Sequence, residues 1–281
     1  HLATVNPNIQ REQMSDMVPA GFVARDGLPI TGYLTIPKGS KGKDLPTVIL
    51  VHGGPTARDY WGYRADVQLL ASRGYAVLQI NFRGSYGYGK NFTTAGFKEW
   101  GKKMQDDITD GANWLIKEGI ADKNKIAIFG SSYGGYAALA GATFTPDMYA
   151  CAISYVGPSN LFTLLNNLPS YWEPEKEMLY EMIGNPIKDS LFLYNASPVF
   201  HVENIKVPLF IAQGGNDPRV NKNESEQMVD ALRNRDVNVV YMLKANEGHG
   251  FKLEENRLAF YKTLIGFLSE NMPAEGAYIK P

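Results

Sequence analysis

Short apolar runs alternate with amphipathic stretches along most of this sequence. The run Thr47–Val51 is continuous, as expected of a strand whose two faces are both buried. The same reasoning predicts strands at 47–51, 76–80, 126–129, 151–156, 207–212 and 237–243, and helices at 63–72, 106–117, 136–140 and 254–269. This alternation predicts an α/β fold in which a mostly parallel central sheet carries helices on both faces.

Three segments depart from the alternation. Residues 30–36 alternate in hydrophobicity and stop at Pro37, which favours an antiparallel hairpin at the sheet edge. Residues 1–20 show no clear period, so we expect an N-terminal arm or linker remnant there, followed by one large domain over residues 21–281. Residues 159–201 contain no buried strand and predict a helical insertion above the carboxyl edge of the sheet, where insertions commonly wall a pocket.

Composition narrows the classes of partner. The 281 residues are 44% apolar and 20% charged, as is usual for a soluble globular protein. With 28 basic and 29 acidic residues, neither nucleic acid nor an anionic membrane is expected as a partner. No apolar run reaches the ~18–20 residues that span a bilayer. The chain begins at His1 without a signal-like segment, so we expect a processed chain or a piece of a longer one, and the cytoplasm and the periplasm both stay open.

The sequence contains no cofactor or metal motif. No cluster of His, Cys and acidic residues has zinc spacing. The stretch Gly84–Gly89 is rich in glycine but lacks the P-loop ending and the dinucleotide-binding spacing. The single cysteine, Cys151, lies in an apolar run and is expected to be buried rather than reactive. The acidic pair Asp106–Asp107 is expected in the first turn of a helix, where the helix dipole stabilises it.

The most informative stretch is Gly130-Ser131-Ser132-Tyr133-Gly134, which matches the G-x-S-x-G pattern between a predicted strand and a predicted helix. A serine on so sharp a turn needs glycine two positions away on either side, because strand and helix otherwise collide. The turn presents the hydroxyl of Ser132 at the positive end of the helix. Ser132 is therefore the candidate nucleophile, and Ser131 is expected to point elsewhere.

A serine hydroxyl at neutral pH needs a base to take its proton and a group to orient that base. In folds built on this elbow, the order along the chain is Ser, then Asp or Glu, then His. Of the four histidines, His1 is terminal, His201 ends the insertion and His52 precedes the elbow. His249 follows the last predicted strand and lies between glycines that let its ring reach inward, so it is the candidate base.

The orienting acid is expected in the loop after the strand at 207–212, where Asp217 stands. Two alternatives stay open. Asp217 precedes Pro218 and could serve only as a turn residue. Glu247 is the nearest rival acid, although two residues from His249 it is badly placed to accept a hydrogen bond from that ring.

Acyl transfer at such a serine also needs N–H donors for the oxyanion that forms. One is expected to be the backbone N–H of Tyr133, directly after the nucleophile. The other is expected from His52-Gly53-Gly54-Pro55, the loop after the strand at 47–51, with Gly54 as the donor. His52 itself is expected to brace this loop rather than to take part in the chemistry.

Five segments, in this order, resemble the catalytic domain of the prolyl oligopeptidase family of serine peptidases, most closely its acylaminoacyl-peptidase branch, with the dipeptidyl peptidases as cousins. They are Val51-His52-Gly53-Gly54-Pro55, Asn81–Gly89, Gly130–Gly135, Gly215–Val220 and Glu247–Phe251, within about residues 20–270. The resemblance implies an α/β-hydrolase fold, the triad Ser132, Asp217 and His249, and the oxyanion donors Gly54 and Tyr133. It also implies that the segment from Val156 to Phe162 helps to wall the pocket for the substrate residue before the scissile bond.

The resemblance implies hydrolysis of short peptides through an acyl-enzyme, without a cofactor. A carboxylesterase with the same triad is the first alternative. A non-catalytic binding module of the same fold is the second, and an intact triad argues against it. Asn221 stands where many relatives have proline, which we expect to affect loop rigidity more than chemistry.

Members of this family carry a β-propeller ahead of the catalytic domain, and this chain has no room for one. We therefore expect a missing propeller in the parent chain, an exposed apolar patch where it docks, and a tendency to form homo-oligomers.

The glutamates of the insertion are expected to form a solvated helical face; they are Glu173, Glu175, Glu177 and Glu181. The isolated chain is therefore expected to distinguish poorly between free and acylated peptide N-termini.

Overall fold

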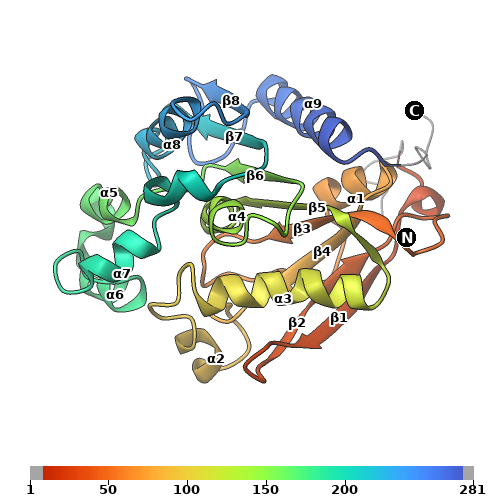
Figure 1. Cartoon of the computed structure of the whole chain (residues 1–281), viewed down its shortest axis with the longest axis horizontal. Coiled ribbons are helices and arrows are strands. Elements are labelled where there is room, and N and C mark those ends of the chain that lie inside the picture. Colours follow the sequence, from red (N-terminus) through yellow and green to blue (C-terminus); the bar gives the residue numbers. More distant parts are fainter. Residues whose placement is uncertain (1–8, 275–281) are drawn as a thin grey trace, which may run out of the picture.

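The computed structural model describes residues 9–274, in which an eight-stranded sheet forms the centre of the fold (Figure 1). In spatial order the strands are β1 (Met17–Val23), β2 (Pro29–Thr35), β4 (Ala76–Asn81), β3 (Leu45–Val51), β5 (Ala121–Ser131), β6 (Cys151–Tyr155), β7 (Leu209–Gly214) and β8 (Val239–Lys244). The β1–β2 and β2–β4 pairs are antiparallel, and every pair from β4 to β8 is parallel. The predicted α/β fold with a mostly parallel sheet is confirmed.

Each face of the sheet is covered by helices that bury an apolar side. The helices on one face are α1 (Ala65–Ser72) and α9 (Glu254–Asn271), and those on the other are α3 (Lys103–Lys117), α4 (Tyr133–Phe144) and α8 (Asn223–Arg233) (Figure 1). Strands β3 and β4 are buried at every position, which explains the apolar runs Val48–Val51 and Ala76–Leu78 within them. Cys151 is fully buried within β6, as predicted.

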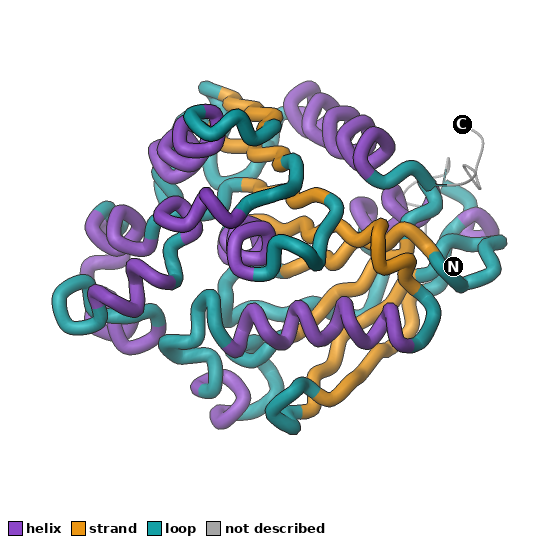
Figure 2. Tube along the Cα trace, in the orientation of Figure 1, coloured by secondary structure: helices purple, strands orange, loops and turns teal. Residues whose placement is uncertain are grey.

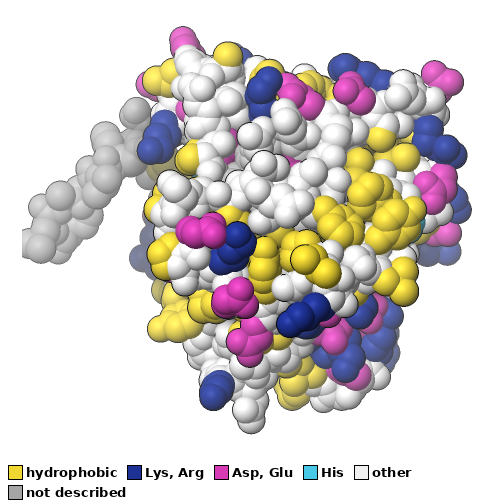
Figure 3. All heavy atoms as spheres, turned by 90° about the vertical axis from the view of Figure 1, so that its left-hand side faces the viewer, with side chains coloured by type: hydrophobic (Ala, Val, Ile, Leu, Met, Phe, Trp, Pro, Cys, Tyr) yellow, Lys and Arg dark blue, Asp and Glu magenta, His cyan; other side chains and the backbone are white. Residues whose placement is uncertain are grey.

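The predicted insertion consists of short helical segments joined by loops (Figure 2). These are α5 (Leu161–Asn166), a 3₁₀ turn at Ser170–Glu175, α6 (Lys176–Met182), α7 (Ser190–Asn195) and a second 3₁₀ turn at Pro198–Asn204. Hydrophobic side chains gather on the face of the molecule that carries this insertion (Figure 3). The large exposed ones within it are Tyr171, Met178, Ile187, Leu191 and Tyr194.

One strand and two α-helices lie outside the prediction. Strand β1 begins at Met17, inside the range expected to be an arm, and pairs along its whole length with β2. It is an edge strand without a fully buried residue, and Pro19 and Gly21 interrupt its alternation, so the hydrophobic pattern is weak. Helices α2 (Lys90–Thr94) and α8 were also not predicted. The division of the chain into an arm and a domain stays a prediction.

The acidic pair at the start of α3 has two different roles. Asp106 lies in the first helical turn, as predicted. Asp107 follows it, is fully buried, and accepts two hydrogen bonds from the guanidinium of Arg83, of 2.6 and 2.8 Å, and a third from the Arg83 backbone N–H. Hydrogen bonds from Arg83 also lower the pKa of Asp26 to about 2. Arg83 thus fixes the loop after β4 to helix α3 and to the β1–β2 turn.

We expect Arg83→Met to destabilise the fold strongly, because the buried carboxylate of Asp107 loses its charged partner and keeps only the hydrogen bond from the backbone N–H of residue 83. Breaking a buried ion pair in this way costs about 3–5 kcal/mol in the free energy of unfolding, which urea denaturation measures. Arg25→Met is the matched control, since the half-exposed Arg25 pairs with Asp106 and Asp110 on the same helix. An exposed pair contributes about 1 kcal/mol or less. Equal losses in the two variants would contradict the assigned role of Arg83.

Candidate active site

Ser132 occupies a strained turn between β5 and α4. Its backbone has φ 57° and ψ −119°, a conformation that residues other than glycine rarely adopt. The Ser132 N–H donates to the carbonyl of Tyr155 at 2.9 Å, which ties the turn to the end of β6. The surrounding sheet therefore holds the strain, and the serine side chain stays partly exposed at the carboxyl edge.

The two elbow glycines are required by close backbone contacts. A Cβ atom at Gly134 would lie 2.0 Å from the carbonyl oxygen of Val51. A Cβ atom at Gly130 would lie 2.5 Å from the backbone of Gly134 and 2.6 Å from the carbonyl oxygen of Val51. This is the collision between strand and helix that the sequence pattern predicts.

His249 and Asp217 are hydrogen-bonded to each other on neighbouring loops. The distance from His249 Nδ1 to Asp217 Oδ2 is 2.8 Å, and the Asp217 side chain is completely buried. The other carboxylate oxygen accepts the backbone N–H groups of Arg219 and Val220, at 2.9 and 3.0 Å. Because a carboxylate only accepts, His249 Nδ1 carries the proton, and Nε2 is left free to accept one.

Glu247, the rival acid, has other partners. Its carboxylate accepts the backbone N–H groups of Lys252 and Leu253, at 2.8 and 3.0 Å, and a hydrogen bond from the amide of Asn256 at 2.8 Å. It therefore joins the loop that carries His249 to the first turn of α9. The carboxylate bonded to the histidine ring is that of Asp217.

Within residues 9–274, no hydrogen bond joins Ser132 to His249. Catalytic hydrogen bonds of this kind are often long in the free enzyme and shorten in the complex with substrate. The loop of His249 is held by a bond from the Phe251 N–H to the hydroxyl of Tyr155. Tyr155 also receives the N–H of Ser132 at its carbonyl, so one residue of β6 contacts both loops.

The predicted oxyanion donors lie on one pocket with the serine. Gly54, Ser132 and Tyr133 all line a cavity of about 440 Å³ at the carboxyl edge of the sheet. Tyr133 is the first residue of α4, where a backbone N–H has no acceptor within the helix. Its N–H is thus available beside the nucleophile, at the positive end of the helix dipole.

The pocket wall is mainly aromatic and aliphatic. Its large side chains come from the insertion and from the loop after α2, namely Phe97, Trp100, Leu164, Leu168, Trp172, Met178, Leu179, Met182 and Ile183. Two charged side chains of the described residues, Glu175 and Arg219, also lie on the wall. Glu175 was expected on a solvated helical face. No feature of the sequence distinguishes it from the neighbouring glutamates.

Val156 and Phe162, expected on this wall, are not among the residues that line it. Val156 follows β6 and is only 2% exposed. The ring of Phe162, on α5, packs against Phe200, with 6.2 Å between ring centroids. Leu164 lines the pocket instead. Residues two apart on a helix point to nearly opposite sides, so α5 can present only one of the two.

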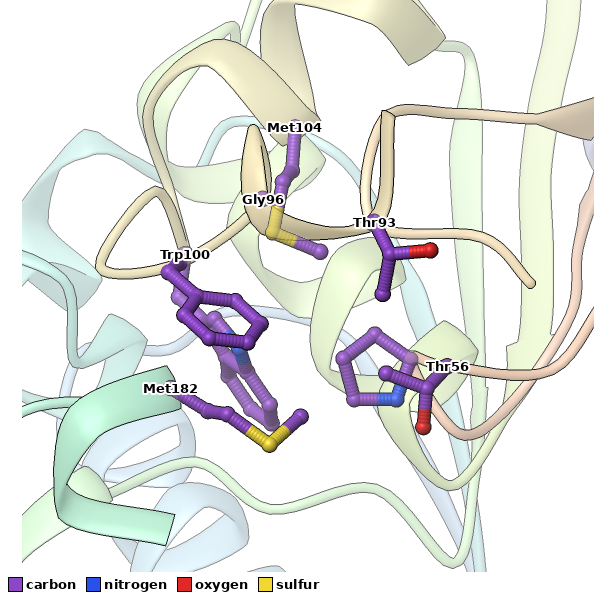
Figure 4. A pocket seen from close by; sticks show the side chains of 9 residues that line it. Thr56, Thr93, Gly96, Trp100, Met104 and Met182 are labelled. Atoms are coloured by element: carbon purple, nitrogen blue, oxygen red, sulfur yellow. The ribbon is translucent and has the colours of Figure 1, made fainter. Parts of the chain in front are cut away.

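A smaller cavity of about 10 Å³ shares six of its lining residues with the pocket (Figure 4). The side chains of Trp100, Met104 and Met182 surround it together with Thr56 and Thr93, and they come from different parts of the chain. Met182 is the last residue of α6, so the insertion closes this end of the site. Methionine side chains adapt their shape readily, which makes this an adjustable end for an apolar group.

The described residues hold no cluster of three or more His, Cys, Asp or Glu side chains that could bind a metal ion. None of their helices is long and apolar enough to cross a membrane. The mixed sheet, the strained serine after β5, and the acid and histidine after β7 and β8 together define an α/β-hydrolase.

Comparison with known proteins places the chain within that class. The family model described as "Prolyl oligopeptidase family" matches residues 61–274, so the chain belongs to the prolyl oligopeptidase family of serine peptidases. The resemblance expected from the sequence motifs is confirmed.

Two relatives are named dipeptidyl peptidases. The chain is 45% identical to dipeptidyl aminopeptidase BIII of Pseudoxanthomonas mexicana over 278 residues, which cover 96% of this chain and 40% of the relative. It is 37% identical to dipeptidyl peptidase family member 6 of Caenorhabditis elegans, with 99% and 41% covered. The chain thus spans less than half the length of these relatives.

Solved structures show the same fold. A puromycin-hydrolyzing peptidase of Mycobacterium tuberculosis superposes with a TM-score of 0.90 at 28% identity, over 98% of this chain and 42% of that one. The acylaminoacyl peptidase of Pyrococcus horikoshii gives a TM-score of 0.85 at 26% identity, with 95% and 43% covered. These structures, too, are more than twice as long as the part that matches.

Proposed function

We propose that Ser132, His249 and Asp217 catalyse a two-step acyl transfer from a peptide to water. The observation that carries this proposal is the 2.8 Å hydrogen bond between Asp217 and His249, on loops at the edge where the strained Ser132 stands. His249 Nε2 takes the proton of the Ser132 hydroxyl as its oxygen attacks the carbonyl carbon, and returns it to the leaving amine. In the second step His249 Nε2 takes a proton from a water molecule, whose oxygen attacks the acyl carbon, and returns that proton to the Ser132 oxygen as the ester bond breaks and the acid is released.

The negative charge that develops on the carbonyl oxygen needs fixed donors. We assign this role to the backbone N–H groups of Gly54 and Tyr133, which line the pocket together with the nucleophile. Asp217 holds the imidazole in the tautomer that accepts at Nε2 and stabilises the imidazolium that forms. No step of this mechanism requires a metal or a cofactor.

The substrate that fits this site is a short peptide with an apolar residue before the scissile bond. The wall formed by Trp100, Trp172 and Met182 offers a large apolar surface next to Ser132. Small esters with apolar acyl groups fit the same site and are expected as side substrates. No feature of the pocket favours a carboxylesterase or a non-catalytic module over a peptidase.

The sequence led us to expect poor discrimination between free and acylated N-termini, but Glu175 favours a peptide whose N-terminus is free. Its exposed carboxylate lies on the pocket wall, and among the described residues it forms no ion pair. An α-amino group has a pKa near 8 and is positively charged at neutral pH, so Glu175 can bind it, whereas an acylated N-terminus carries no charge. The names of the two relatives above, both dipeptidyl peptidases, agree with an aminopeptidase that releases dipeptides.

We expect Glu175→Gln to lower kcat/KM for a free dipeptide amide by about tenfold, equivalent to about 1.4 kcal/mol of lost binding. The rate with the matching N-acetylated peptide should not change. Chromogenic peptide pairs that differ only in the acetyl group measure both. Glu177→Gln is the matched control, since Glu177 is also exposed but lines a different surface hollow. An equal effect of Glu175→Gln on free and acetylated peptides would contradict terminus recognition by Glu175.

The remaining expectations about the parent protein stay predictions. A β-propeller ahead of this domain would narrow access to the pocket and explain why the relatives are more than twice as long. The exposed apolar side chains of the insertion are where we propose that such a domain docks, or that copies of the chain associate in its absence. Labelling of Ser132 by a fluorophosphonate tests whether the isolated chain is an active hydrolase.

A further inference from the structure

Gln213 is a fully buried glutamine of β7 whose side chain contacts the loop of Asp217. Its amide nitrogen Nε2 lies 3.3 Å from Asp217 Oδ2 and 3.1 Å from the carbonyl oxygens of both Gly214 and Val220. Its amide oxygen Oε1 accepts a hydrogen bond of 3.0 Å from the hydroxyl of Ser225, on α8. Both polar atoms of the side chain therefore have partners within the protein, and one of these partners belongs to the proposed triad.

The three acceptors determine the orientation of the amide. Carbonyl and carboxylate oxygens only accept hydrogen bonds, so the group that faces all three must be the NH₂ of Gln213. The opposite orientation would place Oε1 against the carboxylate of Asp217 and two carbonyl oxygens, all of which repel it. The hydroxyl of Ser225 then donates to Oε1. Gln213 thus donates to the same carboxylate oxygen that accepts the proton on His249 Nδ1.

The buried carboxylate of Asp217 is held at both of its oxygens. Oδ1 accepts the two backbone N–H groups described above, and Oδ2 accepts the Nδ1–H of His249 and the amide of Gln213. Among the described residues, Gln213 is the only side chain other than His249 that donates to this carboxylate. It is therefore the side chain that can keep Oδ2 pointed at the ring while His249 gains and loses a proton at Nε2.

The loops that carry Asp217 and His249 touch through their backbones, so packing sets their relative position. A Cβ atom at Gly214 would lie only 2.1 Å from the carbonyl oxygen of Gly248, the residue directly before His249. Gln213 donates to backbone carbonyls at both ends of the Asp217 loop. The same amide therefore fixes this loop and orients the carboxylate that the loop carries.

We propose that Gln213 is a positioning residue that keeps Asp217 Oδ2 directed at His249 Nδ1 throughout the reaction. The inference rests on the proposed function, because it takes Asp217 as the acid that orients the base. Without the amide, Oδ2 keeps only the bond from the histidine, and the carboxylate can pivot about Oδ1 when the ring moves. The imidazole then spends less time in the tautomer and orientation that accept the proton of Ser132.

The test compares Gln213→Met with the same substitution at Gln105, a buried glutamine of α3 that does not line the pocket of Ser132. Methionine has nearly the length of glutamine but no N–H group. Gln213→Met should lower kcat for a chromogenic peptide by about 10–100-fold, the factor that corresponds to one hydrogen bond to a charged group. The KM should stay within about threefold, because Gln213 does not line the pocket either. Gln105→Met should leave kcat within about threefold of wild type.

The KM separates positioning from a purely structural role. Arg219 and Val220, in the Asp217 loop, line the pocket, so a loop that merely lost its shape would change KM as well as kcat. Gln213→Asn is the second variant. Its amide ends one carbon–carbon bond short of Asp217, so its kcat should fall as in Gln213→Met, and it decides the question if Gln213→Met does not fold.

Proton NMR provides a readout that does not depend on activity. The proton on His249 Nδ1, held against a carboxylate, resonates far downfield, and its loss in Asp217→Asn identifies it. In Gln213→Met this resonance should move upfield and exchange faster with water, because a carboxylate that pivots holds the proton less firmly. In Gln105→Met it should not move.

Wild-type kcat in a folded Gln213→Met, an unmoved His249 resonance, or a change in KM as large as the change in kcat would each overturn the proposal. Absence of Ser132 labelling by a fluorophosphonate in the wild type would instead refute the proposed function. In that case the NMR comparison still decides whether Gln213 positions the carboxylate of Asp217.

Discussion

Ser132→Ala should abolish peptide and ester hydrolysis while leaving the fold intact. The hydroxyl of Ser132 is the only nucleophile that the site presents in the proposed mechanism, and loss of a triad serine costs on the order of 10⁴–10⁶ in kcat. Hydrolysis of a chromogenic ester measures the activity, and urea denaturation measures the fold. Because alanine has a β-carbon like serine, the strained backbone at φ 57° gains no new clash.

Ser131→Ala is the matched control. Ser131 belongs to the same elbow, but it lines the cavity of about 310 Å³ on the side away from the substrate pocket. Its loss should therefore change kcat by less than about tenfold, the effect expected for a neighbour that touches no reacting atom. If the two variants lost activity equally, the assignment of the nucleophile within the elbow would be wrong.

Asp217→Asn should slow turnover by about 10⁴-fold without unfolding the protein. An asparagine amide can donate to His249 Nδ1, which favours the tautomer whose proton is on Nε2, and that ring cannot accept the proton of Ser132. The backbone N–H groups of Arg219 and Val220 can still donate to the remaining amide oxygen, so the loop should keep its shape. Single-turnover kinetics with an ester substrate measure the chemical step directly.

Glu247→Gln tests whether Glu247 rather than Asp217 orients His249. Glu247 contacts the start of α9 rather than the histidine ring, so this variant should lower the stability of the loop and leave kcat within about tenfold of wild type. A variant at Asp217 that kept wild-type turnover, together with a large loss at Glu247, would reverse the assignment of the orienting acid.

The sequence determined the central sheet and the elbow because both depend on local rules. A strand buried on both faces must be apolar along its length, and a serine on a strand-to-helix turn needs Gly130 and Gly134 beside it. The identities of Asp217 and His249 followed from their order along the chain and from the strands they follow. Their hydrogen bond agrees with that reasoning.

The tertiary structure decided which side chains of the insertion reach the pocket. Leu164 lines it whereas Phe162 does not, and Glu175 lines it whereas Glu177 does not. In both pairs the residues have similar chemistry and lie two positions apart. Only the orientation of a short helical segment against the sheet distinguishes them, and short segments take that orientation from packing rather than from intrinsic propensity.

The sequence pattern also could not predict contacts between residues that are far apart in the chain. Asp107 looked like a residue stabilised by the helix dipole, but it binds Arg83, 24 positions earlier in the chain. His52 was expected to brace a loop, and the structure supplied its long-range partner Ser85, 33 positions later in the chain. A local sequence pattern indicates only which contacts a residue can make with its near neighbours in the chain. The sheet brings distant loops together at its carboxyl edge, and there burial and unpaired charge determine which contacts form.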